Sequence, residues 1–323
     1  MNYFTFFWSY PNDFVTLIVN SLRRMVFLVG IGFFSMIIAC SKPNNPETKG
    51  DNSSQIIDEP DPILVETEII IDASDLDHLP KDTGGTHTAF PLGTTEAYFG
   101  HYVYTPSGYT NDGPEYPLII FMHGWGERGD SSNDPSELDK VLSWGPPRLI
   151  RSNNWDPSYP FVVVSPQLNF TYWPTNKIHE FITYVIDNYQ INTNRIYVTG
   201  LSLGGGGSWF YAGEMGEESY AAAIVPISAS GGAHLIENLA KVPIWAFHGA
   251  DDPLVNAFDN FGSVPMVNAI NQLNPEVKAK LTVYKGTAHN AWTNTYKNLP
   301  ADANEYDKFD VSIYDWMLQY KRE

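Results

Sequence analysis

The chain has 323 residues, of which 43% are hydrophobic and 14% aromatic, which is enough apolar material for one substantial core. It carries 37 acidic and 19 basic residues, so its formal net charge is −18. Nucleic acids and anionic membrane surfaces are bound through basic patches, so this balance argues against both classes of partner. The sequence shows no internal repeat and no zinc-ligand or phosphate-loop pattern, so neither a metal nor another cofactor is expected.

The N-terminus has the pattern of an export signal. Arg23 and Arg24 precede the apolar run 25–38, and Cys40 follows shortly after it. A basic segment, a short apolar run and a small residue before the cleavage point are typical of a secretory signal peptide. The letters IIAC fit a bacterial lipobox, in which the cysteine becomes the lipid-modified first residue.

Cys40 is the only cysteine of the chain, so it has no intrachain disulfide partner, and lipidation explains its place at the cleavage point. We expect residues 1–39 to be a lipoprotein signal peptide and the mature chain to be anchored in the bacterial cell envelope, at the outer membrane. A transmembrane anchor is the alternative, but the apolar run falls short of the ~20 residues that span a bilayer.

Residues 40–62 are polar and contain prolines, which is typical of a flexible tether. Residues 63–323 are expected to form one folded catalytic domain. Its first segment, 63–71, either adds a strand or covers a sheet edge, and the alternating pattern of 97–104 predicts an antiparallel strand.

Strands and helices alternate through the rest of the chain. The predicted strands are 117–122, 161–165, 195–199, 221–227, 242–247 and 279–284, and the predicted helices are 178–190, 203–215, 261–273 and 309–321. This alternation predicts an α/β fold with a doubly wound, mostly parallel sheet and antiparallel strands at its N-terminal side. The gap between 227 and 242 is too short for a large lid domain.

The strand at 117–122 runs into a glycine-rich loop, HGWGERGD, at 123–130. A backbone N–H in such a loop can point at an oxygen that becomes negatively charged during a reaction. We assign this role to the N–H of Trp125, and a tight turn without chemistry is the alternative. Glu127 and Arg128 are expected to form a local ion pair that shapes the loop.

The segment 131–159 is a longer insertion with several aromatic residues. We expect a shallow, largely open site edged by aromatic side chains, with Trp173 and Trp292 as substrate-binding candidates beside Trp125. Aromatic rings at a cleft can stack on sugars or phenolic rings, although core packing is the alternative for each of them.

The strand at 195–199 leads into the turn Gly200–Gly204, which has the pattern G-x-S-x-G. In a strand–turn–helix context this turn holds a serine in a strained, exposed position at the edge of an α/β sheet. We therefore predict that Ser202 is a nucleophile and that the N–H of Leu203, the next residue, is a second oxyanion donor. A glycine-rich turn with an incidental serine is the alternative.

The nucleophile needs a base and an acid further along the chain, in the order serine, acid, histidine. Asp251 and Asp252 follow the strand at 242–247, and Asp252 is favoured because Pro253 can fix the turn behind it. His289 follows the strand at 279–284 and comes after the acid, whereas His248 is expected to brace the acid's loop. An imidazole can accept and return a proton near neutral pH, and a carboxylate fixes its tautomer.

These motifs resemble those of the α/β-hydrolase superfamily, and within it the bacterial esterases described as predicted peptidases, phospholipase/carboxylesterases or feruloyl-esterase-like proteins. The resemblance covers about residues 95–321 and rests on HGWGERGD at 123–130, SPQ at 165–167, RIYVTGLSLGG at 195–205, VPIWAFHGADDPLV at 242–255 and GTAHNAW at 286–292. It implies that Ser202, Asp252 and His289 form a catalytic triad. One departure is Gly206, which lengthens the glycine run behind the serine.

The resemblance implies a serine carboxylesterase that acts through an acyl-enzyme on an ester substrate, with acyl or feruloyl groups on polysaccharides as the expected targets. A serine peptidase is the first alternative, but peptidases of this superfamily usually carry a gating domain for which the chain has no room. A catalytically silent, glycan-binding surface lipoprotein is the second, and the complete set of serine, acid and histidine argues against it.

Overall fold

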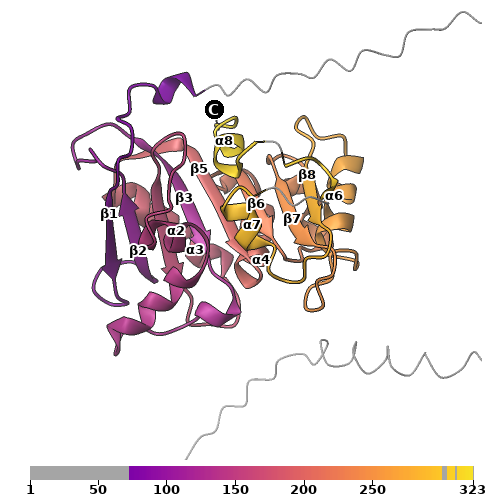
Figure 1. Cartoon of the computed structure of the whole chain (residues 1–323), viewed down its shortest axis with the longest axis horizontal. Coiled ribbons are helices and arrows are strands. Elements are labelled where there is room, and N and C mark those ends of the chain that lie inside the picture. The colour runs from indigo at the N-terminus through magenta and orange to yellow at the C-terminus, as the bar shows by residue number, and fades with distance from the viewer. Residues whose placement is uncertain (1–72, 300–303, 310, 323) are drawn as a thin grey trace, which may run out of the picture. The chain divides into compact units, whose positions relative to one another are not determined.

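A nine-stranded sheet organises the fold (Figure 1). The computed structural model describes residues 73–299, 304–309 and 311–322. The strand order is β1-β2-β4-β3-β5-β6-β7-β8-β9. The strands are β1 (Thr86–Phe90), β2 (Gly100–Thr105), β3 (Tyr116–Met122), β4 (Val162–Gln167), β5 (Ile191–Leu201), β6 (Ala221–Ile227), β7 (Trp245–Gly249), β8 (Lys280–Tyr284) and β9 (Asn304–Tyr306).

All strands from β4 to β8 in this order run parallel, so their carboxyl ends lie along one edge of the sheet. The antiparallel strands are confined to the two sides, where β2 pairs with β1 and β4, and β9 pairs with β8. The predicted doubly wound, mostly parallel sheet with antiparallel N-terminal strands is therefore confirmed. The segment 63–71 lies outside the described residues, as do residues 1–62.

The central strands are buried along their whole length, which explains their continuous apolar sequences. Every residue of β3, β4 and β6 is buried. Helices pack on both faces of a parallel sheet, so such strands have no solvent-facing side on which polar residues would be favourable.

Helices α3, α4, α5 and α6 form one series in which each contacts the next. The connection from β3 to β4 moves in the opposite direction across the sheet, and its helix α2 contacts α7 instead. Right-handed crossovers place these two groups on opposite faces. The helices are α2 (Gly145–Arg151), α3 (Thr175–Asn188), α4 (Leu203–Met215), α5 (Ile236–Leu239), α6 (Ser263–Gln272), α7 (Trp292–Tyr296) and α8 (Ile313–Met317), with 3₁₀ helices η1 (Ser74–Leu76), η2 (Trp125–Glu127), η3 (Pro135–Ser143), η4 (Gly216–Glu218) and η5 (Ala233–Leu235).

The structure differs from the predicted elements mainly at the periphery. Strand β1 was not predicted, because its side chains are exposed or half-buried and show no apolar alternation. The helix predicted at 309–321 is limited to α8, and the short helices α2 and α7 were not predicted. Between β6 and β7 the chain forms only η5 and α5, so no lid domain is inserted there.

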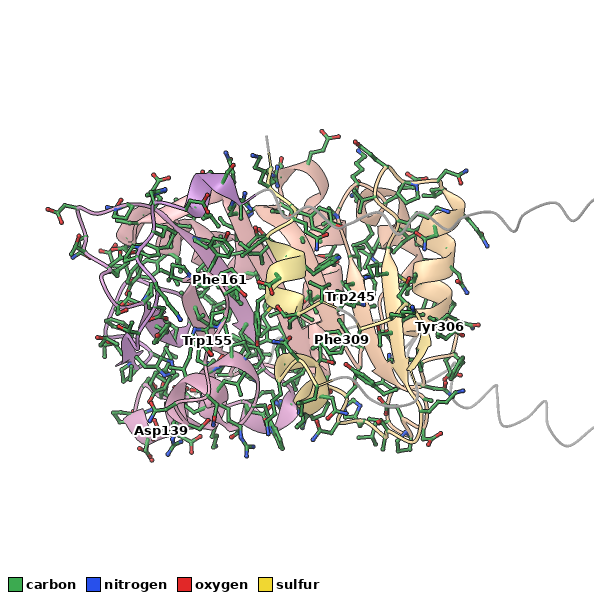
Figure 2. All side chains as sticks on the ribbon, turned by 45° about the horizontal axis from the view of Figure 1, so that its top comes forward. Asp139, Trp155, Phe161, Trp245, Tyr306 and Phe309 are labelled. Carbon is green, nitrogen blue, oxygen red and sulfur yellow. The ribbon has the colours of Figure 1, made fainter. Side chains whose placement is uncertain are left out.

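Aromatic side chains fill the core beside β7. The ring of Trp245 meets the edge of Phe309 at a centroid distance of 5.5 Å, and the two lie close together in Figure 2. Trp245 also contacts Trp316 of α8 at 5.5 Å, and its Nε1–H donates to the hydroxyl of Thr282 on β8. The C-terminal segment is thereby packed against the sheet.

A buried arginine joins distant parts of the chain. Arg195 of β5 is fully buried and donates from Nε and Nη2 to Asp75 of η1, at 2.7 and 2.5 Å. Its Nη1 donates to the carbonyl of Leu318. The hydrogen bond to Arg195 is the largest cause that holds the pKa of Asp75 below its ordinary value.

We predict that Asp75→Asn lowers the free energy of unfolding by about 1–3 kcal/mol, because it replaces charge-assisted hydrogen bonds to the buried guanidinium by weaker, uncharged ones. Urea denaturation at pH 7 measures the loss, and Glu96→Gln, at an exposed position, serves as the control and should stay within about 0.5 kcal/mol.

The pH dependence of this loss in stability follows from the lowered pKa of Asp75. Since the folded pKa of Asp75 lies below 3.8, its contribution is complete above that pH and is lost as the pH falls through the lowered pKa. The difference between Asp75→Asn and the wild type should therefore shrink in acid, and a difference that is constant down to acid pH would contradict this explanation.

Candidate active site

Ser202 occupies a strained turn between β5 and α4. Its backbone has φ 51° and ψ −117°, which is a left-handed conformation that residues with a side chain rarely adopt. The close approach of three elements enforces it. A Cβ atom on Gly200 would lie 2.4 Å from the backbone of Gly204, and one on Gly204 would lie 2.0 Å from the carbonyl oxygen of Met122 on β3. These glycines let β5 and α4 pass so close that Ser202 is held at the turn.

Ser202, His289 and Asp252 form a continuous chain of hydrogen bonds. The Oγ of Ser202 lies 2.8 Å from Nε2 of His289, and Nδ1 of His289 lies 2.7 Å from Oδ2 of Asp252. The carboxylate can only accept, so Nδ1 carries the proton and Nε2 accepts the hydroxyl proton of Ser202. In this tautomer the imidazole is ready to act as a general base.

The sheet brings these three residues together from distant parts of the sequence. They follow the carboxyl ends of β5, β7 and β8, which lie along the same edge. Active sites of open α/β sheets lie at this edge because the loops that leave the parallel strands converge there.

The side chain of Asp252 is buried and held in one orientation. Its Oδ1 accepts from the backbone N–H groups of Leu254 and Val255, at 2.9 and 3.0 Å. Burial opposes ionisation, but the hydrogen bonds from His289 and from these two N–H groups outweigh it and keep the pKa of Asp252 below its usual value. Asp251, the competing candidate, is exposed, so the structure places Asp252 and not Asp251 against His289.

A second imidazole contacts the same carboxylate. Nε2 of His248 lies 2.8 Å from the carbonyl oxygen of Val255 and 3.2 Å from Oδ2 of Asp252, and Nδ1 lies 2.7 Å from the hydroxyl of Ser263. Burial lowers the pKa of His248, so the ring is neutral and donates from Nε2. His248 thus connects the loop that carries Asp252 to Ser263 of α6, as expected for a residue that holds this loop in place.

The two residues assigned as oxyanion donors line the same cavity as Ser202. Trp125 begins η2 and Leu203 begins α4, and N–H groups in the first turn of a helix have no acceptor within that helix. A Cβ atom on Gly124 would lie only 3.5 Å from Cβ of Ser202, so the loop after β3 runs directly beside the serine. This arrangement can present two N–H groups to an oxygen bound at Ser202.

His123 fixes the start of this loop. Its Nδ1–H donates to the carbonyl of Gly124 at 2.6 Å, and its Nε2 accepts the N–H of Leu168 at 2.9 Å. Burial lowers the pKa of His123 to about 4, so the ring stays neutral and keeps both hydrogen bonds at neutral pH.

The predicted ion pair between Glu127 and Arg128 does not form in the described structure. The guanidinium of Arg128 lies over the ring of Trp125 at 3.3 Å and donates to the carbonyl oxygens of Trp125 and Phe170. The side chain of Glu127 turns inward, where burial raises its pKa, and it accepts hydrogen bonds from the backbone of Gly124 and the side chain of Trp144. Both side chains shape the loop, but through separate partners.

A cavity of about 840 Å³ opens beside Ser202. This volume lies at the upper end of the range for small-molecule sites. Aromatic side chains form much of its wall, among them Trp125, Tyr172, Trp173 and Phe210. Trp173 is on this wall although it is only 4% exposed, and its Nε1–H donates to the carbonyl of His123 at 3.3 Å. Its role in substrate binding stays a prediction.

Trp292, by contrast, is not on the wall of this cavity. It is 8% exposed, and its ring meets that of His289 edge to face at a centroid distance of 5.1 Å. Helix α7 begins at Trp292 and turns the ring inward toward Trp144, at 6.0 Å. Trp292 therefore packs against the imidazole of His289. The prediction that Trp292 borders the open site is wrong, because its side chain lies in the interior beside Trp144.

Two wall residues were missed in the sequence. Phe210 lies two turns along α4 from Leu203, so the helical period places it on the same face as the start of the helix, and that spacing could have identified it. Tyr172 belongs to the loop before α3, whose path no local pattern determines.

None of the helices in the described ranges is long and apolar enough to cross a bilayer. Among these same residues, no group of three or more histidine, cysteine, aspartate or glutamate side chains is arranged to hold a metal ion.

Two solved structures similar to this one are esterases. A thermostable esterase has 26% sequence identity and a TM-score of 0.55, over 74% of this chain and 63% of the other. This chain thus spans less than two thirds of that protein. The feruloyl esterase module from Clostridium thermocellum, solved in complex with sinapinate, has 18% identity and a TM-score of 0.50, over 73% of this chain and 88% of the other.

No protein-family model matches the sequence, and no curated protein matches it either. The strand order, the strained serine after β5 and the two solved structures agree with one another. The chain therefore has the α/β-hydrolase fold, and both of these solved structures are esterases.

Proposed function

We propose that this protein is a serine carboxylesterase that hydrolyses esters through an acyl-enzyme. The observation that carries the proposal is the hydrogen-bonded chain from Ser202 through His289 to Asp252, with Ser202 held in a strained turn beside a cavity. The 26% identical thermostable esterase supports the same class of activity.

In the first half of the reaction, Oγ of Ser202 attacks the ester carbonyl carbon while Nε2 of His289 takes the hydroxyl proton. The carbonyl oxygen gains the negative charge and accepts hydrogen bonds from the N–H groups of Trp125 and Leu203. Asp252 stabilises the imidazolium that forms. His289 then returns the proton to the leaving alkoxide, which departs as an alcohol.

In the second half, a water molecule attacks the acyl-enzyme, and His289 takes one of its protons. The new tetrahedral intermediate collapses, Ser202 leaves with the proton from His289, and the carboxylic acid is released. The same two N–H groups stabilise both intermediates, because the oxygen occupies the same place in each.

The substrates that we propose are esters with aromatic or other apolar acyl groups, including feruloyl or acyl groups on polysaccharides. The aromatic wall of the cavity supports this choice, since rings such as those of Trp173 and Phe210 bind flat, apolar groups well. Release of ferulate or acetate from an acylated glycan would support the polysaccharide part of the proposal, and activity on simple soluble esters alone would oppose it.

We further propose that the enzyme is exported and anchored in the cell envelope through a lipid on Cys40, with 40–62 as its tether. The sequence pattern at 23–40 is the support, and these residues lie outside the described structure.

Ser202→Ala should lower ester turnover by about 10⁶-fold, because the nucleophile is lost and the other triad residues act only through it. Labelling by a fluorophosphonate probe should vanish as well. Ser230→Ala removes another serine hydroxyl that lines the same cavity, keeps the nucleophile, and should still be labelled. A folded wild type that takes up no probe would instead favour a silent, glycan-binding protein.

Asp252→Asn should lower kcat by about 10³- to 10⁴-fold, because an amide can donate to Nδ1 and so favours the wrong tautomer of His289. Asp251→Asn is the matched control, since Asp251 is exposed next to it, and it should leave kcat within about twofold of the wild type. Equal losses of kcat in the two variants would contradict the assignment of Asp252 as the acid of the triad.

Cys40→Ser should move the protein from the membrane fraction of its host to the soluble fraction and should abolish labelling with radioactive palmitate. Ser41→Ala, at the neighbouring position, keeps the thiol and controls for a change in export. Retention of Cys40→Ser in the membrane would favour a transmembrane anchor.

A further inference from the structure

One face of α4 runs along the cavity beside Ser202. The residues of this helix that line the cavity are Leu203, Gly206, Gly207, Phe210, Glu214 and Met215. The first five have the spacing of a single stripe on a helix surface. At 1.5 Å per residue the stripe extends about 16 Å from the nucleophile, so the cavity continues well past the reacting bond.

Gly206 differs from the glycines before it, because packing does not require it. A Cβ atom on Gly204 would lie 2.0 Å from the carbonyl oxygen of Met122, and one on Gly205 would lie 2.6 Å from that of Ile227. At Gly206 the nearest atom is the carbonyl oxygen of Ser230, at an ordinary contact distance of 3.8 Å. A side chain at 206 would thus meet no obstacle and would extend into the cavity.

Glycine inside a helix is also unfavourable in itself, since it lowers helix stability relative to alanine. The chain therefore keeps a destabilising residue at a position where the backbone does not need one. A side chain at position 206 would fill part of the cavity, so the glycine keeps that space open.

The position of His289 indicates which half of an ester enters this cavity. The imidazole must hand its proton to the leaving alcohol, so the alcohol lies on the side of His289. The cavity is lined by Ser202 and by the two residues assigned as oxyanion donors, Trp125 and Leu203, and His289 is not among its lining residues. A group in the cavity is therefore attached to the carbonyl carbon on the side away from the leaving oxygen.

Building on the proposed esterase function, we infer that the cavity along α4 is the acyl site and that Gly206 is a specificity-determining residue that admits large acyl groups. The aromatic rings near Ser202 favour a flat, apolar acyl group. At the far end, the carboxylate of Glu214 accepts a hydrogen bond from Thr175 at 2.5 Å. This charge disfavours acyl groups that end in a carboxylate.

The test compares the wild type with Gly206→Leu and Gly206→Ala on three esters: 4-nitrophenyl acetate, 4-nitrophenyl cinnamate and 2-naphthyl acetate. The first two differ only in the acyl group, and the two acetates differ only in the alcohol. Asn268→Leu, on the exposed face of α6 and away from the cavity lining, controls for an added leucine.

In Gly206→Leu, kcat/KM for the cinnamate should fall by about 10- to 200-fold, the range expected when a few carbon atoms obstruct an apolar site. Both acetates should stay within about threefold of the wild type. In Gly206→Ala the loss on the cinnamate should be smaller, while the midpoint of thermal unfolding rises. The gain in stability shows that lower activity does not result from unfolding.

A selective loss on 2-naphthyl acetate would place the alcohol in the cavity and overturn the inference, as would unchanged kinetics on all three esters. If Gly206→Leu does not fold, Gly206→Ala decides in the same way. A wild type that hydrolyses none of the esters and takes up no fluorophosphonate would contradict the proposed esterase function instead.

Discussion

The close packing of β3, β5 and α4 is the constraint on which the site depends. Gly204 brings the start of α4 against the end of β3, and this contact forces Ser202 into a positive φ. The same contact sets the path of the loop after β3, because Gly124 must then run beside the serine. One packing requirement therefore positions both Ser202, the proposed nucleophile, and a candidate oxyanion donor, and any side chain at Gly204 would disturb the two together.

Aromatic packing connects the imidazole of His289, through Trp292 of α7, to Trp144 of the insertion at 131–159. Trp292 packs against His289, and Trp144 packs against Trp292, while the side chain of Trp144 also acts on the pKa of the buried carboxyl group of Glu127. Glu127 in turn holds Gly124. The base and the loop beside the nucleophile are therefore parts of one packed assembly, which couples their positions.

The buried parallel strands could be predicted from the sequence because a strand covered on both faces must be apolar throughout, as in β3 and β6. The order of motifs also singled out Ser202, Asp252 and His289, which the structure places within hydrogen-bond distance of one another. β1 could not be predicted, since its pairing with β2 is a tertiary interaction and its own side chains carry no period. The place of Trp292 depends on the direction in which α7 begins, which no local pattern determines.

The carboxylate of Asp252 accepts hydrogen bonds from His289 and from two backbone N–H groups, and Nε2 of His248 lies 3.2 Å from it. Each of these donors stabilises the anion and makes the carboxylate a weaker base. A proton gained by His289 therefore has no tendency to move on to the acid, and it remains on the ring until an alkoxide collects it. In the proposed mechanism, the proton that His289 takes from Ser202 is therefore the same one that it passes to the departing alcohol.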